Sequence, residues 1–365
     1  MVTRKKIVGE LIRKMFELEN ELLIIISQIH LNEREKNKMH NICSKRLNWQ
    51  YIIAQAARNK VVCLLYFHLY QNKEIFKIDE WVYKILENYY IATRDVLQIL
   101  DKEMFEICNL LNERKISYAI LKGFNLQERL YSESERCIRE FGDIDILVKK
   151  QDIREIRDVL KCKGFIQGKY NFINERIEPI SRQEELYWRL NTNQVGRFIR
   201  IIPNGKVTHR EICTVDVNFT IFEGGKKKDK IETEKLLSNV VLDGEKNYNV
   251  LDNEYDFLQV CYHFYKDIFY KDKINNQNDY ILAKFCDVKE YVSQYRTIIK
   301  WDRLIEIIKK NDLNEAIYTT LLLVTRLYTA LDLDKILKKI VPEDDYKIKK
   351  LVSIDKYIYG MIFRL

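Results

Sequence analysis

The sequence predicts an α+β fold in which a mixed β-sheet lies between two helical regions. The first reason is the placement of glycine and proline, which are disfavoured inside helices. Nine of the 11 glycines and two of the three prolines lie between residues 123 and 244, and neither type occurs in 10–122 or 245–341. The second reason is that the cleanest alternation of apolar and polar residues lies in the same middle part. We therefore expect helical regions at 1–115 and 251–365, and a strand-containing core at 116–250.

Composition limits the broad class of the protein. A hydrophobic share of 47% over 365 residues is ample for a globular core, and no run approaches the roughly 18 apolar residues of a membrane span. The apolar patch at 22–26 is too short for a signal-peptide core. Eight scattered cysteines without a CxxC pair indicate reduced thiols. We expect a cytoplasmic protein without a membrane partner, and no feature indicates its oligomeric state.

The net charge is modest, at +8 from 62 basic and 54 acidic residues. This balance is compatible with a nucleotide or a tRNA as partner. A net charge of this size mainly affects solubility and the electrostatic steering of ligands. The densest basic stretch, GGKKK at 224–228, could meet phosphate or form a solvated loop. Two Cys–His combinations, Cys261 with His263 and His209 with Cys213, lack the second pair of ligands that structural zinc needs.

The first region is expected to consist of packed helices. Asn48 is a candidate N-cap for a helix whose residues Trp49, Ile52, Ile53 and Ala56 supply apolar positions. No pattern of residues in this region indicates a catalytic site.

The core begins with ISYAILKG at 116–123, an apolar run that ends in Lys122 and Gly123 before the helix-like FNLQERLY. Glycine at a strand-to-helix turn lets backbone approach a ligand, and the first N–H groups of the helix can bind phosphate. Lys122 can add a positive charge. Such a glycine can equally do no more than form the turn.

The next strand, GDIDILV at 142–148, places two acids side by side. Because successive side chains of a strand point to opposite faces, Asp143, Asp145 and Leu147 share one face. Two aspartates about 7 Å apart can hold a hard divalent cation through oxygen, with magnesium and a phosphate ligand as the natural occupants. A solvated face or a charged edge strand would give the same pattern. The apolar flanks favour a buried strand, in which an unpaired acid is costly.

A helix and a hairpin follow. Asp152 can cap a helix that Gly164 closes. Strand-like runs at 194–202 and 206–222 flank Pro203-Asn204-Gly205, a sequence typical of a hairpin. Arg197 and Arg200 on the first of these strands could contact phosphate or carry solvated edge charge.

The second strand of this hairpin contains CTVDVNFTIF at 213–222. Its alternation puts Val215, Val217, Phe219 and Ile221 on one face, and Asp216 in the middle of the polar face. Since the hairpin leads directly into Asp216, we expect this acid to lie beside the strand of Asp143. A half-exposed strand is the alternative interpretation.

These motifs resemble the polymerase-β-like nucleotidyltransferase superfamily, and within it the bacterial family of uncharacterised nucleotidyltransferases. The resemblance rests on the LKG turn, on Arg-x-x-Gly-Asp-x-Asp at 139–145, and on the later acidic strand. It extends to the helical stretch 47–69 and to C-terminal helices at 257–267 and 284–310. The chain departs from the family at Asn218, where His is expected, and at Phe124, where better-known members have Gly-Ser.

The resemblance implies a polymerase-β-like core and a metal-dependent transferase. Asp143, Asp145 and Asp216 would be the catalytic and metal-ligating residues, holding Mg²⁺, with two ions expected and Mn²⁺ as an alternative. The nucleotide-binding residues would be Lys122, Gly123, Arg139 and Gly142. A nucleoside monophosphate would pass from a triphosphate, ATP by preference, to a hydroxyl or amine of an unidentified acceptor. The modest charge favours a small molecule or peptide over tRNA as that acceptor.

Two other classes remain open. A catalytically degenerate scaffold of the same fold, which binds nucleotide or protein without turnover, is consistent with the unusual Phe124 and Asn218. A glycosyltransferase that uses DxD to bind a nucleotide sugar would need a longer α/β domain before the acids, which the glycine-free first third does not offer.

Overall fold

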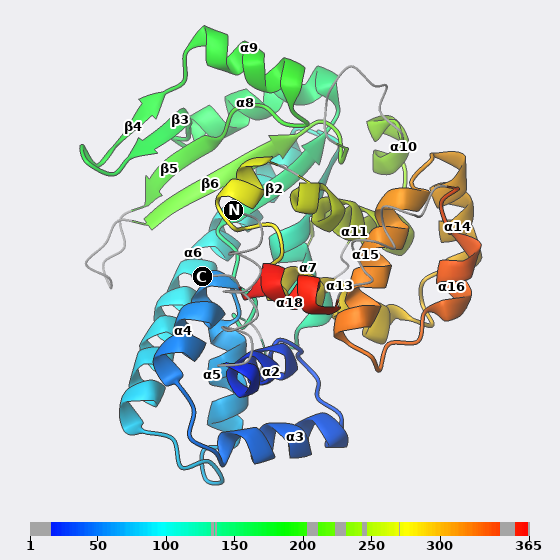
Figure 1. Ribbon diagram of the computed structural model, residues 1–365. Helices are drawn as coiled ribbons and strands as arrows, with labels where there is room; N and C mark the ends of the chain where they lie inside the picture. Colours follow the sequence, from blue (N-terminus) through cyan, green and yellow to red (C-terminus); the bar gives the residue numbers. More distant parts are fainter. Residues whose placement is uncertain are drawn as a thin grey trace, which may run out of the picture. The chain divides into compact units, whose positions relative to one another are not determined.

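The computed structural model describes residues 16–132, 135, 137–202, 211–222, 231–242, 247–269, 271–343 and 355–363. Its architecture is α+β, as the sequence predicts, with helices before and after a mixed β-sheet (Figure 1). The chain forms two compact units: unit 1 contains 1–94, 130–140 and 260–365, and unit 2 contains 95–129 and 141–259. The first and the last described residues thus belong to unit 1. The predicted boundaries at 115 and 250 divide the chain into three consecutive segments, and they do not coincide with the boundaries of these two units.

Unit 2 contains the sheet. Within the described residues, eight strands pair in the order β4-β3-β5-β6-β2-β1-β8-β7 (Figure 1). Strand β2 is parallel to β6 and β1 is parallel to β8, whereas the other neighbours are antiparallel. The two strands that carry the acids are therefore adjacent in the middle of the sheet. The strands are β1 (Tyr118–Leu121), β2 (Asp143–Val148), β3 (Ile166–Asn171), β4 (Arg176–Pro179), β5 (Phe198–Ile202), β6 (Glu211–Asn218), β7 (Val240–Leu242) and β8 (Asn249–Leu251).

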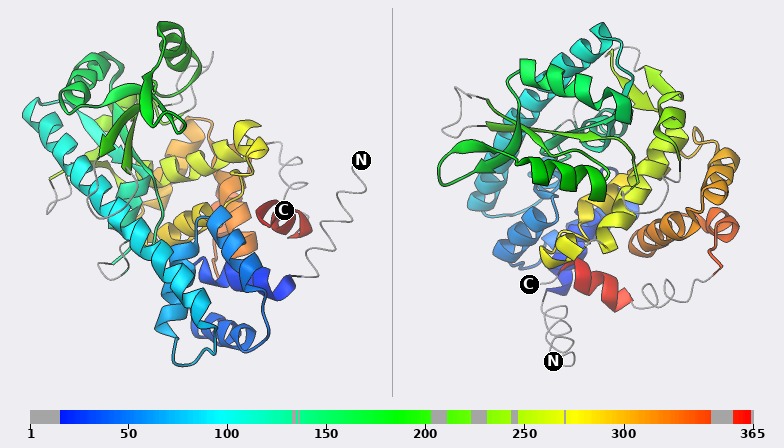
Figure 2. Two further views of the ribbon diagram at one scale, coloured as in Figure 1. Left: turned by 90° about the vertical axis from the view of Figure 1, so that its left-hand side faces the viewer. Right: turned by 90° about the horizontal axis from the view of Figure 1, so that it is seen from above.

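The helices of unit 2 include α8 (Ile153–Cys162) and α9 (Arg182–Asn191), which run beside the strands in both views of Figure 2. The apolar residues Ile153, Ile156, Val159 and Leu160 of α8 are buried, and Gly164 follows the helix with a φ of +82°, a value that favours glycine. Asp152 occupies the N-cap position, but its side chain makes no capping hydrogen bond. The others are α7 (Lys122–Leu130), the short 3-10 helix η2 (Lys150–Asp152) and α10 (Thr233–Leu237), while α6 (Glu80–Glu113) and α11 (Asn253–Phe269) contribute residues to both units.

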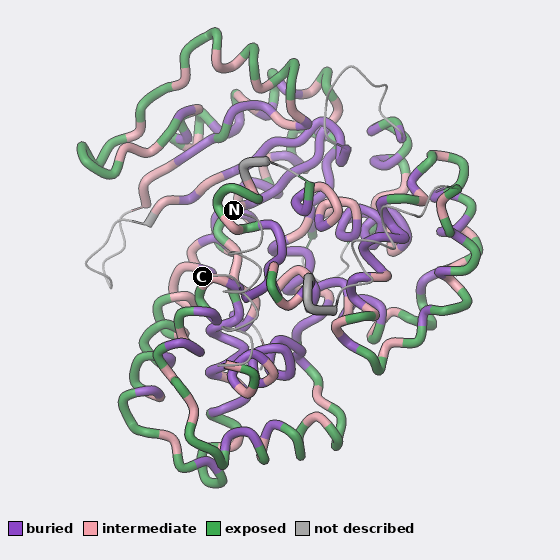
Figure 3. Tube along the Cα trace, viewed as in Figure 1, coloured by how far each residue is buried: buried purple, intermediate pink, exposed green. Residues whose placement is uncertain are grey.

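Strand β6 is shorter and more deeply buried than its sequence suggests. It ends at Asn218 rather than at 222, and it pairs with β5 as the expected hairpin would, although the proposed turn at 203–205 lies outside the described residues. The residues 224–228 and His209 also lie outside them. Asp216 and Asn218 on the polar face, and Thr220 just after the strand, are all at most 4% exposed, while Thr214 is half-buried. Figure 3 shows this burial along β6 and β2, in contrast to α9, which has no buried residue. A half-exposed strand is therefore the wrong interpretation of the alternation.

The described part of unit 1 is helical. Asn48 caps α4 as expected, because its side chain accepts a hydrogen bond from the backbone N–H of Tyr51 at 3.0 Å. Among the described residues, no helix combines the length and apolar character required to cross a lipid bilayer. Besides parts of α6 and α11, the helices are α2 (Glu17–Ile26), α3 (Glu33–Cys43), α4 (Trp49–Arg58), α5 (Val62–Gln71), α12 (Lys271–Asn275), α13 (Leu282–Tyr295), α14 (Trp301–Lys310), α15 (Asn314–Leu327), α16 (Asp334–Lys339) and α18 (Asp355–Ile362).

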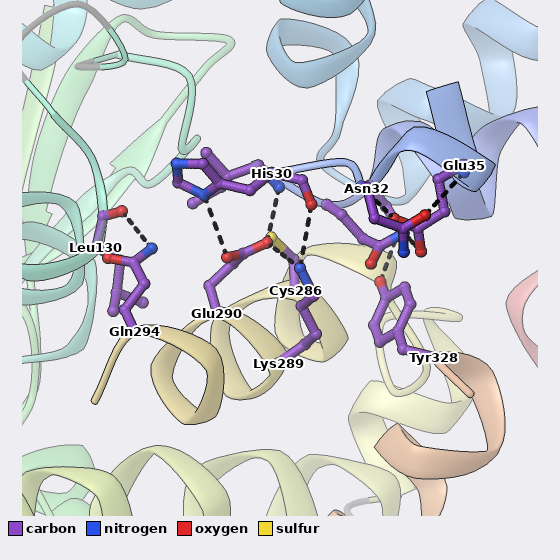
Figure 4. A network of polar contacts seen from close by, with 12 residues as sticks. His30, Asn32, Glu35, Leu130, Cys286, Lys289, Glu290, Gln294 and Tyr328 are labelled. Carbon is purple, nitrogen blue, oxygen red and sulfur yellow. Dashed lines mark hydrogen bonds and ion pairs between the residues drawn. The ribbon is translucent and has the colours of Figure 1, made fainter. Parts of the chain in front are cut away.

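A buried carboxylate on α13 joins segments of unit 1 that are far apart in sequence. Glu290 Oε1 accepts hydrogen bonds from the Ile29 backbone N–H at 2.9 Å and from Lys289 Nζ at 2.8 Å, and Oε2 lies 3.5 Å from His30 Nδ1 (Figure 4). Burial alone would raise the pKa of Glu290, but these partners outweigh it and lower that pKa to about 2. The folded state thus favours the ionised form of this side chain.

We expect Glu290→Gln to destabilise the protein in a pH-dependent way. Since the folded pKa is depressed, the stabilising effect is present above pH 4.5 and is lost as the pH falls toward 2. A shift of this size corresponds to roughly 3 kcal/mol of unfolding free energy at pH 7. Urea denaturation at pH 7 and pH 3 will measure the difference, which should shrink at pH 3. An equal difference at both values would contradict an electrostatic role for Glu290.

Candidate functional site

The register of β2 and β6 brings two of the predicted acids together. Asp145 is the direct neighbour of Asp216 across the parallel pair, so both side chains project from the same face of the sheet. They are 5% and 4% exposed, respectively. Asp143 lies two residues before Asp145 on that face, is half-buried, and raises the pKa of Asp216 through its charge. The expected proximity of the DxD strand and the Asp216 strand is thereby confirmed.

Lys122 supplies a cation to this face. It follows β1 directly and is the first residue of α7, and its Nζ donates a hydrogen bond to Asp145 Oδ1 at 3.0 Å. Burial would lower its pKa, but the carboxylates of Asp145, Asp143 and Asp216 outweigh burial and raise it. Its φ of +47° lies in the left-handed region, which costs a non-glycine residue on the order of 1–2 kcal/mol.

Asp216 is the least satisfied of the acids. Its Oδ1 is buried and makes no hydrogen bond. Arg197 Nε lies 3.2 Å from that oxygen as an ion pair, outside hydrogen-bonding geometry, and the arginine side chain is 50% exposed. Burial, with the charge of Asp145 as the next cause, raises the pKa of Asp216 to about 7. A carboxyl group of this kind can exchange a proton near neutral pH.

Two asparagines complete the acidic face, and reasoning from the sequence missed both as partners of the acids. Asn218 Nδ2 donates to Asp145 Oδ1 at 3.2 Å, and Asn193 Nδ2 donates to Asn218 Oδ1 at 3.1 Å. Asn218 is two residues after Asp216 on the polar face of β6, which is the signal that could have identified it. Asn193 precedes β5 and carries no comparable signal.

The order of these elements along the chain can be compared with known proteins. A family model described as an uncharacterised nucleotidyltransferase matches residues 45–329, which include both acidic strands and the LKG turn. The chain belongs to this nucleotidyltransferase family. No curated protein gives a significant match.

The two glycines of the nucleotidyltransferase motifs have different surroundings. A Cβ on Gly123 would lie 3.0 Å from ring atoms of Phe141, so this glycine allows an aromatic ring to pack on the turn. A Cβ on Gly142 would meet nothing within 4 Å. Gly142 therefore borders open space immediately before Asp143, whereas the absence of a side chain at Gly123 serves internal packing.

Arg139 makes a different contact from the one that a nucleotide-binding role would require. Its Nε and Nη2 donate to the two carboxylate oxygens of Asp287 at 2.8 and 2.9 Å, and both side chains are largely buried. Both residues belong to unit 1, whereas the aspartates belong to unit 2. The role of Arg139 toward nucleotide stays a prediction. Arg200, the other arginine noted in the hairpin, pairs with Glu103.

The carboxylate oxygens of the aspartates are chemically suited to bind a hard cation. Carboxylate oxygens are the ligands that Mg²⁺ prefers, and the buried Asp216 Oδ1 has no hydrogen-bond donor. Among the described residues, however, no group of three or more His, Cys, Asp or Glu side chains has the arrangement of a metal site. The residues that converge are Asp145, Asp216 and the Lys122 ammonium, with Asp143 at the margin. The magnesium site of three acids therefore stays a prediction, and the chemical types of these residues suit it.

Proposed function

We propose that the protein transfers a nucleoside monophosphate from a magnesium-bound triphosphate, ATP by preference, to a hydroxyl or amine of an acceptor, with release of pyrophosphate. One observation supports this most strongly: in a chain of the nucleotidyltransferase family, Asp145 and Asp216 are direct neighbours on one face of the sheet, beside a lysine that begins a helix. Asp143 is the third acid of the proposed site.

The triphosphate would bind at the start of α7. The first N–H groups of a helix have no partner within it and carry partial positive charge, so they favour phosphate. Lys122 and Gly123 begin this helix, and the open space at Gly142 lies beside Asp143. Bound magnesium, held by the three aspartates, would supply charge stabilisation for the transferring phosphoryl group.

Asp216 would accept the proton of the attacking group. In the metal-free protein burial raises the pKa of Asp216 to about 7, and a cation bound beside it would favour the ionised form, which is the form that accepts a proton. Asn218 would keep Asp145 oriented through the bond to its Oδ1. Arg197, half-exposed beside Asp216, would balance the charge of that acid.

The acceptor in this proposal is a small molecule or a peptide. The net charge of +8 is small for a chain of 365 residues, and the sequence contains no recognised RNA-binding motif. A tRNA is the less favoured acceptor. The competing function is a scaffold that binds nucleotide or protein without turnover; retention of all three acids favours the enzyme.

Titration calorimetry of ATP, CTP, GTP and UTP, with and without magnesium, will test the proposal. We expect magnesium-dependent binding of one triphosphate by the parent protein. The Asp143→Asn, Asp145→Asn double variant should lose that binding while it retains the circular dichroism spectrum of the parent. Folded parent protein that binds none of the four would favour the scaffold function.

The two glycines offer a matched pair of variants. Gly142→Ala should change the free energy of unfolding by less than about 0.5 kcal/mol, because nothing lies within 4 Å of the new methyl group. It should weaken triphosphate binding, since the methyl group occupies the space beside Asp143. Gly123→Ala should cost about 1–2 kcal/mol of stability, because the Phe141 ring must move. Chemical denaturation and calorimetry on both variants will check this, and unchanged triphosphate affinity in Gly142→Ala would remove Gly142 from the site.

A further inference from the structure

Lys122 lies where its ammonium group can bind two anions in turn, the carboxylate of Asp145 and a phosphate group of the triphosphate. Its Nζ donates to Asp145 Oδ1 at 3.0 Å, while its backbone begins α7, the helix at whose start the proposed function places the triphosphate. A lysine at a helix N-terminus is electrostatically unfavourable, because that end of the helix dipole is already positive. The left-handed backbone of Lys122 adds to this cost. The carboxylates of Asp145, Asp143 and Asp216 favour the charged lysine and so offset the electrostatic cost.

The contact also limits how Asp145 can bind a cation. Oδ1 of Asp145 accepts hydrogen bonds from both Lys122 Nζ and Asn218 Nδ2. A charge-assisted bond from an ammonium group both neutralises the carboxylate and occupies one of its oxygens. A divalent cation that approaches Asp145 without a triphosphate must therefore compete with a cation that belongs to the protein.

We propose that Lys122 is an exchangeable counter-ion, which holds Asp145 until a triphosphate draws it away and so couples cation binding to nucleotide binding. The inference rests on the proposed function and deepens it. The phosphate groups offer Lys122 a second anionic partner next to its own helix turn, and Asp145 is then released to the cation that accompanies the nucleotide. By thermodynamic linkage, each of the two ligands strengthens the binding of the other by the same factor.

The coupling can be measured directly with Mn²⁺, whose free form is observed by electron paramagnetic resonance. Mn²⁺ affinity is determined for the parent protein with and without the α,β-methylene analogue of ATP, which cannot transfer its nucleotide. We expect the analogue to tighten Mn²⁺ binding by at least about tenfold in the parent. In Lys122→Met, Mn²⁺ binding without the analogue should be on the order of tenfold tighter than in the parent, since a charge-assisted competitor is removed. The ratio of the two affinities should then fall by about the same tenfold factor, since only the direct contacts between the cation and the phosphate groups remain.

Two further variants make the result specific. Lys122→Gly removes the same ammonium group and suits the φ of +47°, so it provides a second test of the role of that group without backbone strain. It should lower the ratio of the two affinities by the same factor as Lys122→Met. Lys169→Met is the control, because this exposed lysine of unit 2 pairs with Glu184 and should leave both affinities unchanged. A general change in charge would raise both affinities together and preserve their ratio, which would overturn the proposal.

The outcomes also separate this inference from the proposed function. If the parent binds Mn²⁺ with the analogue and the Lys122 variants keep the parent's ratio, the counter-ion role is wrong and the transferase proposal stands. If folded parent protein binds Mn²⁺ neither with nor without the analogue, both proposals are wrong.

Discussion

Asp145→Asn should lower the rate of nucleotide transfer by at least about 10³-fold, because it removes charge from the residue on which the site converges. Asp145 is the neighbour of Asp216 across the parallel strands, and its Oδ1 binds Lys122 and Asn218. An asparagine keeps the shape of the side chain but replaces one acceptor oxygen with a donor, which opposes both the lysine and a cation. Transfer is measured with a radiolabelled triphosphate once calorimetry has identified the donor.

The matched control for this variant is Asp158→Asn. Asp158 is an exposed aspartate on α8 in the same unit, so its replacement changes the net charge equally without touching the acidic face. We expect it to transfer nucleotide as fast as the parent. Full activity in Asp145→Asn, with the fold intact, would show that the assignment of the acids is wrong.

The sequence was informative where local pattern decides the structure. The alternation of apolar and polar residues predicted the strands that contain Asp145 and Asp216, and also the face of each strand on which the acid lies. This was possible because side chains point to opposite faces in turn along any strand. The hairpin before Asp216 limits where that strand can pair, and β6 does lie beside β2. The family motif and the α+β class rest on the same local features.

Contacts that depend on tertiary structure could not be predicted in the same way. Arg139 lies four residues before Asp143 in the family motif, yet its partner Asp287 is 148 residues away in sequence. A long side chain takes whichever carboxylate the fold brings near, and no period in the sequence encodes that choice. The burial of the polar face of β6 is a similar case, since alternation predicts two faces but not what covers the second.

Asp216→Asn should make the protein more stable and less active. Burial raises the pKa of Asp216 from 3.8 to about 7, so the folded state disfavours the ionised side chain. With a raised pKa, the cost to stability is fully present above pH 7 and fades as the pH falls toward 4. A shift of this size corresponds to roughly 4 kcal/mol at pH 8, and the neutral asparagine removes much of it.

The measurement is urea denaturation of parent and variant in EDTA at pH 8 and pH 5, together with transfer assays at pH 8. We expect a gain in unfolding free energy that is clear at pH 8 and much smaller at pH 5, and a loss of rate of roughly 10² to 10⁴-fold, the usual contribution of a general base. A variant that is less stable at pH 8 would mean that Arg197 fully satisfies Asp216 and that the acid is structural. Opposite effects on stability and activity would instead identify Asp216 as an acid that the fold keeps at a cost, which selection tolerates where chemistry requires it.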